Sequence, residues 1–260
     1  MKSFTKNSLI QELIEIRNRG WIENRRHGNA GAVGNTLEDL LGIEENNLPI
    51  PNAAEWELKT QRETTSSLIT LFHFEPSPRS MKLVPSLLLP KYGWEHQEAG
   101  GKYPNDEMSF RQTIGAHKRS DRGFGISVDR NNDKICVSFD CNFVDPRHSA
   151  WLEDVKKNAG LGELSPQPYW GFNDFLHKLG TKLHNCFFVA AQEKKEGNKR
   201  YIRYTKIYML KDIDLDGIIE AIEDGNILVD FDARTRHNHG TKFRLREKNL
   251  PTLYREVIEY

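Results

Sequence analysis

The sequence predicts a mixed α/β fold in which helices and strands alternate along one chain of 260 residues. Residues 3–19 place apolar side chains at helical spacing, which predicts an amphipathic first helix. Residues 66–74, SSLITLFHF, form an apolar run typical of a strand. In 122–140 and again in 185–210, two strand-like runs flank a short polar turn, which predicts two β-hairpins.

The remaining elements follow from local signals. Gly20 ends the first helix, and Gly42 ends a second one that includes residues 37–41. In the first half of the chain we also expect a strand over 54–60 and an irregular segment over 76–93, which contains four prolines. The second half should contain a polar loop over 145–168, a helix in 169–184 capped by Asn173, and a short helix over 214–224. Two strands with a loop between them are expected in 227–246. We expect a single domain, 1–260, whose two lobes, 1–110 and 111–260, meet near residue 110.

Composition indicates the protein's compartment but not its activity. Lysines and arginines number 37, as do acidic residues, so the net charge is zero. Proteins that coat nucleic acid are usually strongly basic, whereas a DNA enzyme needs only a local basic cleft. The three cysteines form no C-x-x-C pair, and no apolar stretch approaches the roughly 18 residues of a membrane span. With no signal-peptide pattern at the N-terminus, we expect a cytoplasmic protein without a membrane partner.

The stretch AEWELKT carries the first candidate site. If it is a strand, Glu55, Glu57 and Lys59 share one face, while Trp56 and Leu58 face the core. Carboxylates can hold Mg²⁺, which polarises a phosphate and activates bound water, and a lysine can orient that water. The pattern is therefore typical of metal-assisted phosphodiester hydrolysis. A strand with a solvated charged face is the alternative interpretation.

Glu38 lies on the predicted helix that ends at Gly42, shortly before the acidic strand. A helix glutamate beside such a strand can complete a metal shell. A surface charge on an amphipathic helix is the alternative.

A basic segment near the C-terminus, RTRHNHGTKFRLR (234–246), combines four arginines, a lysine and two histidines without an acidic residue. Arginine pairs with guanine, asparagine pairs with adenine, and histidine can donate to base acceptors, so the segment favours base recognition. We expect Lys242 and Arg246 to contact phosphates, which position the protein without specifying sequence. A zinc site at His237 and His239 lacks two further ligands. A plain basic surface loop is the other alternative.

The order of these motifs resembles a known family. G-x-x-G-x-x-L-E-x-x-L-G over 31–42 is followed by ELKT, SSLITLF, YWGF, FFVAAQEKKEGNKRYIRY and RHNHGTKFRL. Each motif is weakly specific alone, but the set in this order is similar to the MutH and MvaI/BcnI group of PD-(D/E)xK endonucleases. The MvaI/BcnI-type restriction enzymes are the nearer match.

The resemblance implies a PD-(D/E)xK core, a central mixed sheet flanked by helices, with a catalytic lobe 1–110 and a DNA-recognition lobe 111–260 forming a DNA cleft. It implies a type II, Mg²⁺-dependent endonuclease that cuts double-stranded DNA at a short G/C-containing site as a monomer, with a cognate methyltransferase in the same system. The catalytic positions it implies are Glu57, Lys59, Glu38 and Asn52, and strand parity adds Glu55 as a further candidate; Glu57, Asn52 and Glu55 are the expected metal ligands. It implies base contacts at His237, His239 and Arg244, with Asn238 between the histidines. From their charge alone, we also expect DNA contacts at Lys242, Arg234, Arg236, Arg25 and Arg26, with an exposed turn as the alternative for the last two.

One position departs from the family pattern. Asn52 follows Pro51 where the family has a metal-binding aspartate, and an amide oxygen brings no charge. Three explanations compete: Glu55 replaces the missing carboxylate, which strand parity favours; Asn52 is an engineered change; or the protein binds DNA without cutting it. A catalytically silent, sequence-specific DNA-binding protein is therefore the main alternative. A MutH-like nicking repair endonuclease is the other.

Overall fold

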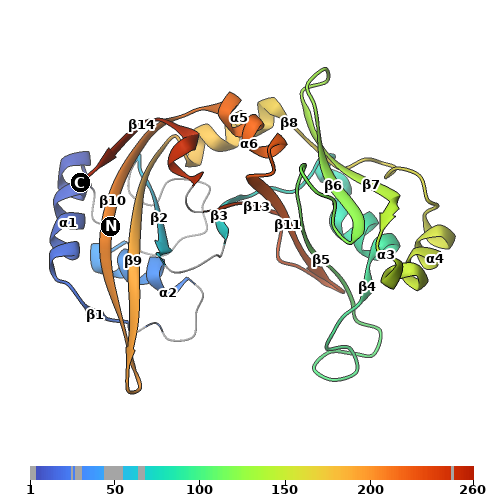
Figure 1. Ribbon diagram of the computed structural model, residues 1–260, viewed down its shortest axis with the longest axis horizontal. Coiled ribbons are helices and arrows are strands. Elements are labelled where there is room, and N and C mark those ends of the chain that lie inside the picture. Colours follow the sequence, from blue (N-terminus) through green and yellow to red (C-terminus); the bar gives the residue numbers. More distant parts are fainter. Residues whose placement is uncertain (1–3, 25, 27–30, 44–54, 64–67, 247–248) are drawn as a thin grey trace. The chain divides into compact units, whose positions relative to one another are not determined.

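The computed structural model describes the chain except residues 1–3, 25, 27–30, 44–54, 64–67 and 247–248 (Figure 1). It has the predicted mixed α+β character and separates into two compact units. Unit 1 comprises Met1–Ser67, Leu176–Leu215 and Glu247–Tyr260, and unit 2 comprises Leu68–Phe175 and Asp216–Arg246. Each unit is built from segments that are far apart in sequence, so their division does not follow the boundary expected near residue 110.

Unit 1 is built on a mixed sheet (Figure 1). Its strand order is β1-β10-β9-β2, and β14 also pairs with β10. Strand β2 runs parallel to β9, whereas the other pairs are antiparallel. The strands are β1 (Ile22–Glu23), β2 (Glu57–Arg62), β9 (Asn185–Glu196), β10 (Lys199–Ile213) and β14 (Tyr254–Glu259).

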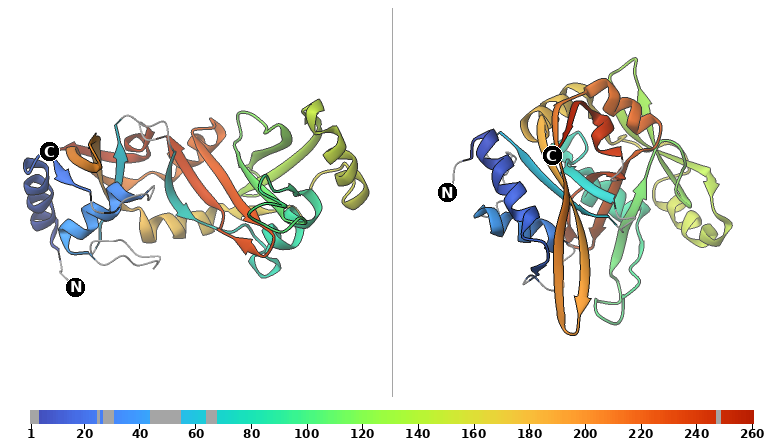
Figure 2. Two further views of the ribbon diagram at one scale, coloured as in Figure 1. Left: turned by 90° about the horizontal axis from the view of Figure 1, so that it is seen from below. Right: turned by 60° about the vertical axis from the view of Figure 1, so that its left-hand side comes forward.

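Two helices, α1 (Lys6–Asn18) and α2 (Ala32–Leu41), provide apolar residues to the core of unit 1. Figure 2 shows α1, in blue, lying beside this sheet. Both helices were predicted, and Gly42 ends α2 in the left-handed conformation at φ 70° that favours glycine. The core cluster includes Leu9, Leu13, Ile16, Leu37, Trp56, Leu58, Phe187, Val189, Ile202 and Tyr204. These residues fix which face of the sheet is buried against α1 and α2.

Unit 2 contains two sheets. The larger has the order β3-β13-β11-β5-β4, with β12 added to β11, and the smaller has the order β6-β7-β8. The strands of the larger sheet are β3 (Leu68–His73), β4 (Trp94–Glu95), β5 (Met108–Ile114), β11 (Ile227–Arg234), β12 (His237–Asn238) and β13 (Lys242–Arg246). Those of the smaller are β6 (Arg122–Asp129), β7 (Lys134–Val144) and β8 (Tyr169–Gly171).

The local predictions were partly confirmed. Both hairpins are present, β6–β7 and β9–β10, and so are α6 (Leu215–Glu223) and the β11–β13 pair. The proline-rich segment was wrongly expected to be irregular. It forms successive helical turns, Arg79–Met81, Val84–Leu88 and α3 (Leu89–Tyr92), and the last two carry a proline in their first turn, where no donor is lost.

Two other expectations were wrong in detail. The expected loop over 145–168 contains α4 (Ser149–Asn158), whose buried Val155 supplies too little apolar pattern to be recognised in the sequence. Helix α5 (Phe172–Lys182) begins before Asn173, which therefore lies inside the first turn and not at the cap. None of the described helices combines the length and apolar character that crossing a membrane requires.

Candidate active site

The paired charges of β2 lie on the sheet face opposite α1 and α2. Glu57 pairs with Cys186 and Lys59 with Phe188 in the parallel β2–β9 ladder. Leu58, between the two charged residues, belongs to the core beneath the helices. Because side chains alternate along a strand, Glu57 and Lys59 point together to the other face, as the sequence predicted.

Glu57 is a buried carboxylate, with only 2% of its surface exposed. Its Oε1 lies 2.9 Å from the Lys59 Nζ and 3.8 Å from the Lys182 Nζ, at the end of α5. Its Oε2 is also buried and has no hydrogen-bond partner in the described part of the chain. Burying a carboxylate oxygen without a hydrogen-bond partner costs free energy, because the oxygen loses its water. The Glu57 Oε2 can therefore accept an additional cation or hydrogen-bond donor.

Apart from its two lysines, Glu57 lies near two buried groups that can titrate, Cys186 and Tyr254. Burial raises the pKa of the Cys186 thiol to about 12. Burial, followed by the effect of Cys186, raises the pKa of Tyr254 well above its ordinary value, and its hydroxyl donates to the Leu183 carbonyl oxygen over 2.9 Å. Both groups therefore stay neutral at physiological pH. A low local dielectric strengthens the attraction between Glu57 and its two lysines.

Sequence reasoning missed Lys182, Cys186 and Tyr254 as neighbours of Glu57. The β2–β9 pairing and the return of the C-terminal segment bring them there, and both are contacts between distant parts of the chain. The only local signal was a lysine in the last turn of a predicted helix.

Helix α2 packs closely against β2, which places Glu38 near the strand that carries Glu57. A Cβ added at Gly34 would lie 3.1 Å from the Thr60 Oγ1, so glycine permits this approach. Glu38 is half-buried and lies one turn beyond Gly34 on the same side of α2. Its contribution to a metal shell stays a prediction.

Glu55 lies outside the strand on which its predicted role depended. It is an exposed turn residue just before β2, and its Oε1 accepts a hydrogen bond from the Trp56 indole over 3.2 Å. Strand parity therefore does not place its carboxylate beside Glu57. Asn52 lies outside the described residues. Among the residues that are described, no three acidic, histidine or cysteine side chains form a group that could hold a metal.

The basic segment of unit 2 forms a ladder of ion pairs across β11 and β13. The Lys242 Nζ lies 3.1 Å from Asp232, and the Arg244 guanidinium lies 3.1 Å from Asp230. Arg111, on β5, lies 3.5 Å from Asp232. The two aspartates were missed as partners, although their alternation in ILVDFDAR indicates a shared strand face. The ladder holds Lys242 and Arg244 in fixed positions.

The histidines lie at the exposed turn after β11. The rings of His237 and His239 are 4.1 Å apart, and the Asn238 Oδ1 accepts a hydrogen bond from the Gly240 N–H over 2.9 Å. The described residues around them include no further ligand group for zinc, so this alternative gains no support. Arg236 adopts a left-handed backbone at φ 61°. The segment therefore presents imidazole and amide groups to solvent, where bases could reach them.

The predicted basic contacts outside this turn are already engaged. Arg234 lies 2.9 Å from Glu107 and 4.6 Å from the ring of Tyr103. Arg26 donates to both oxygens of Asp39, over 2.8 and 2.6 Å. A phosphate would have to replace or share these partners. Arg25 lies outside the described residues.

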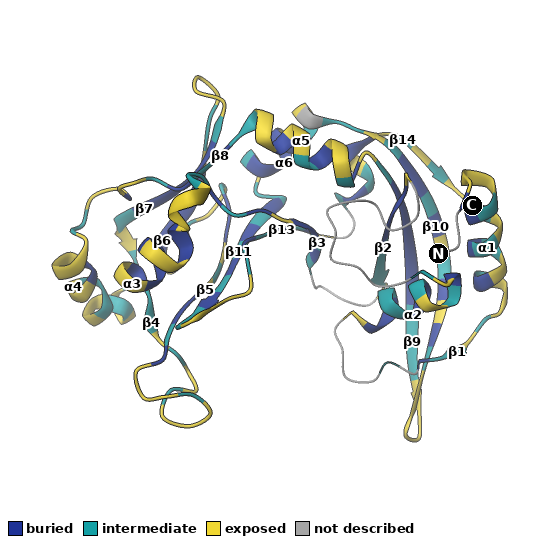
Figure 3. Ribbon diagram, turned by 180° about the vertical axis from the view of Figure 1, so that it is seen from behind, coloured by how far each residue is buried: buried dark blue, intermediate teal, exposed yellow. Residues whose placement is uncertain are grey.

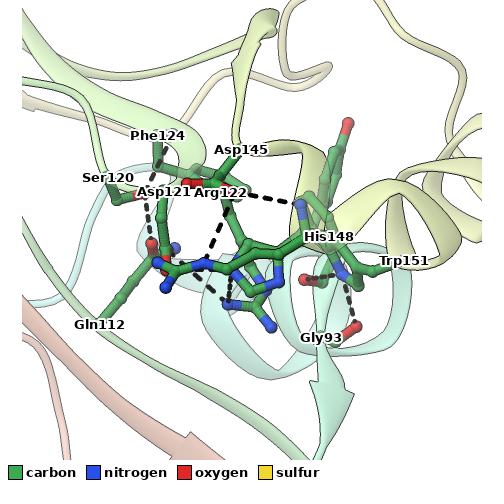
Figure 4. A network of polar contacts seen from close by, with 11 residues as sticks. Gly93, Gln112, Ser120, Asp121, Arg122, Phe124, Asp145, His148 and Trp151 are labelled. Atoms are coloured by element: carbon green, nitrogen blue, oxygen red, sulfur yellow. Dashed lines mark hydrogen bonds and ion pairs between the residues drawn. The ribbon is translucent and has the colours of Figure 1, made fainter.

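The loop HKRSDR, which begins at His117, is part of a structural network (Figure 4). The Asp121 carboxylate binds Arg147 and His148, and the guanidinium of Arg122 lies 4.1 Å from the ring of Trp94. Burial raises the pKa of Asp121, but the hydrogen bond and charge of His148, followed by the arginines, outweigh it, so this pKa lies below its ordinary value. The network fixes the loop in place.

Asp232 is expected to stabilise unit 2 in a pH-dependent manner. Burial raises its pKa, but the hydrogen bond and charge of Lys242, with Arg111 and His239, outweigh burial, so the pKa lies below its ordinary value. A carboxyl with a lowered folded pKa stabilises fully above its unfolded pKa of about 3.9 and loses this effect as pH falls through the folded pKa.

We therefore expect Asp232→Asn to lower the free energy of unfolding by about 1–3 kcal/mol at pH 7 and by much less at acidic pH below the folded pKa. Thermal melts at the two pH values, with the exposed Asp154→Asn as control, measure this difference. Equal destabilisation at both pH values would show that charge is not what Asp232 contributes.

Residues 10–254 match the model of the MvaI/BcnI restriction endonuclease family. The structure is similar to restriction endonuclease MvaI in complex with its cognate DNA substrate, with a TM-score of 0.77, 25% identity and 99% of each chain covered. It is also similar to MvaI in the absence of DNA, with a TM-score of 0.55, 26% identity, and 100% and 99% of the two chains covered. No curated protein sequence matches.

The family model covers nearly the whole chain, and the structural similarity extends over both units. The motifs that carried the resemblance, from the α2 glutamate to the histidine turn, all lie within the matched residues. The chain therefore belongs to the MvaI/BcnI restriction endonuclease family and is a site-specific deoxyribonuclease.

Proposed function

We propose that this protein is a type II restriction endonuclease that hydrolyses phosphodiester bonds of double-stranded DNA at a short G/C-containing site, as a monomer and with Mg²⁺. The observation that carries the proposal is the buried Glu57–Lys59 pair with its unpartnered carboxylate oxygen. The similarity to MvaI, whose structure contains a cognate DNA substrate, supports duplex DNA as the partner. We expect the enzyme to act in the cytoplasm beside a cognate DNA methyltransferase.

Enzymes of the restriction endonuclease class generally use a divalent metal, and the residues here fit one. The Glu57 Oε2 is a buried oxygen with unused acceptor capacity in the described structure. Carboxylate and amide oxygens are the ligands that Mg²⁺ accepts, so Glu57, with Asn52, would hold it. When bound, the metal polarises the phosphate and lowers the pKa of its water.

The chain's own residues then have distinct roles. Lys59, fixed by Glu57, would orient the attacking water and place positive charge beside the phosphate. Lys182 adds a second cation at the same carboxylate, which balances the buried negative charge. Glu38 would complete the shell from α2.

Recognition would fall to unit 2. Arg244, His237, Asn238 and His239 offer donors that match base edges, whereas Lys242 and the other arginines would contact phosphates. Asp230 and Asp232 hold Arg244 and Lys242 before DNA arrives. A fixed side chain loses less conformational entropy on binding, so the ladder favours selectivity.

A digest of unmethylated phage DNA with Mg²⁺ tests the proposal, with sequencing of the fragment ends. We expect discrete fragments whose ends share one short sequence. DNA that is bound in a gel shift but stays intact would contradict the proposal and support a silent DNA-binding protein. Nicks stimulated at hemimethylated sites would instead support a repair nickase.

A further inference from the structure

The sheet face that carries Glu57 and Lys59 continues to the far end of the β9–β10 hairpin. On β9, Gln192 lies an even number of residues after Phe188, the ladder partner of Lys59, and so points to the same face. Glu63 directly follows β2 and contacts this face. Its Oε2 accepts a hydrogen bond from the Gln192 Nε2 over 2.7 Å, and its Oε1 accepts one from the Thr205 hydroxyl over 2.6 Å. These bonds show that Gln192 and Thr205 share the face of the active site, and all these residues belong to unit 1.

Toward the end of the hairpin this face carries a cluster that we call the flank surface, made of Trp21, Lys194 and Arg203. Arg203 lies opposite Gln192, and Lys206 lies nearer the active site, opposite Ala190. The Lys194 Nζ lies 4.5 Å from the centre of the Trp21 ring, and the Arg203 guanidinium lies 5.6 Å from it. The β1–β10 register pairs Ile22 with Ile202, which places Trp21 beside Arg203. The Trp21 indole is 36% exposed and has two cations near its ring, so the cluster is open to a ligand.

The flank surface has more positive charge than its neighbours neutralise. Arg203 and Lys206 are exposed, and no carboxylate in the described part of the chain lies within ion-pair distance of either. Lys194 pairs with the exposed Glu196 over 2.8 Å. Glu63 also borders the cluster, and its pKa is lowered by the Thr205 and Gln192 hydrogen bonds, then by Lys206 and Arg203, against the effect of burial. Net positive charge therefore remains on an exposed face.

Its distance from the active site suits a DNA duplex. Lys59 pairs with Phe188 in the ladder, and Gln192 and Lys194 follow it on β9. At about 3.3 Å per strand residue, these positions lie roughly 13–20 Å along the sheet from Lys59. Successive phosphates of one DNA strand advance by about 3.4 Å along the helix axis, so the distance corresponds to about 4–6 base pairs. Figure 3 shows that this end of the hairpin is exposed.

We propose that the flank surface binds the phosphates of the duplex about 4–6 base pairs from the scissile bond, so that affinity depends on the length of DNA beside the recognition site. The inference rests on the proposed function, because the distance is measured from the proposed hydrolytic site. Trp21 is a positioning residue in this account, since its ring holds Lys194 and Arg203 toward the DNA.

The test compares binding of two duplexes that carry the cleaved sequence, one with about two base pairs on each side and one with about twelve. Fluorescence anisotropy in EDTA measures affinity over a range of salt concentrations for the full chain. The test variant is Lys194→Gln with Arg203→Gln, the two cations beside Trp21. The matched control is Lys195→Gln with Arg200→Gln, which removes the same charge from a cross-strand pair on the opposite face of the same hairpin.

We expect the unaltered protein to bind the long duplex several-fold more tightly than the short one. The test variant should lose this advantage, and its log–log salt slope on the long duplex should fall by about 1.8, or about 0.9 for each lost phosphate contact. The control should keep both the advantage and the slope. Equal losses in test and control variants, or no dependence on duplex length, would overturn the proposal.

Failure of the proposed function gives a different result. If no DNA is cut, no cleaved sequence exists, and random-sequence duplexes of the same two lengths serve as probes. A length advantage that depends on Lys194 and Arg203 would then retain the flank surface as a DNA-binding face without cleavage. Binding that is insensitive to this pair would remove the flank surface whatever the enzyme does.

Discussion

Glu57→Gln is expected to reduce the rate of DNA cleavage by about 10³-fold or more while leaving DNA binding largely intact. The substitution keeps the shape of the side chain but removes the negative charge that fixes Lys59 and would hold the metal. Metal-assisted charge stabilisation contributes several kcal/mol to the transition state, and each 1.36 kcal/mol corresponds to a factor of ten in rate. Single-turnover cleavage and DNA-binding measurements separate the two effects.

The exposed Glu256→Gln, which removes a surface charge from the same unit, provides the control and should cut DNA at the unaltered rate. A Glu57→Gln protein that cuts within tenfold of the unaltered protein would place the hydrolytic centre elsewhere. Loss of DNA binding along with cleavage would indicate a folding defect, which a thermal melt of the variant identifies.

Lys59→Met is expected to destabilise the protein by about 3 kcal/mol and to slow cleavage by about 10²–10⁴-fold. After the substitution, Lys182, at 3.8 Å, is the cation that remains beside the buried Glu57 in the described part of the chain. Removing one partner of a buried ion pair costs about 3–5 kcal/mol, and the second lysine places the expected value at the lower end. Stability is read from the midpoint of urea unfolding.

The double variant Glu57→Gln with Lys59→Met distinguishes charge from packing. It removes both charges, so most of the lost stability should return, although cleavage should not. A double variant that is less stable than Lys59→Met alone would show that the pair contributes shape rather than charge balance.

The local part of this site was predictable from sequence because strand alternation is a local rule. It placed Glu57 and Lys59 on one face and Leu58 on the other, and the structure confirms this arrangement. The same rule failed at Glu55, because β2 begins only at Glu57 and a turn residue has no fixed face. The rule predicts faces only where a ladder of hydrogen bonds exists.

The long-range part of the site was not predictable from one sequence. Lys182 and Cys186 reach Glu57 through the parallel pairing of β2 with β9, which joins segments more than a hundred residues apart. Asp230 and Asp232 likewise become partners of Arg244 and Lys242 only once β11 and β13 align. Periodicity specifies which side chains share a face, but not which strand lies beside them.

The direct test of the central claim is a digest of unmethylated phage DNA with Mg²⁺ by three proteins: the sequence as it stands, Glu57→Ala and Asn52→Asp. If Glu57 is the centre of a working site, the unaltered protein gives discrete fragments, Glu57→Ala gives none, and Asn52→Asp cuts at the same sequence. Fragments that persist in Glu57→Ala would contradict the account. Fragments that appear only with Asn52→Asp would contradict the claim that the protein as it stands is an active nuclease.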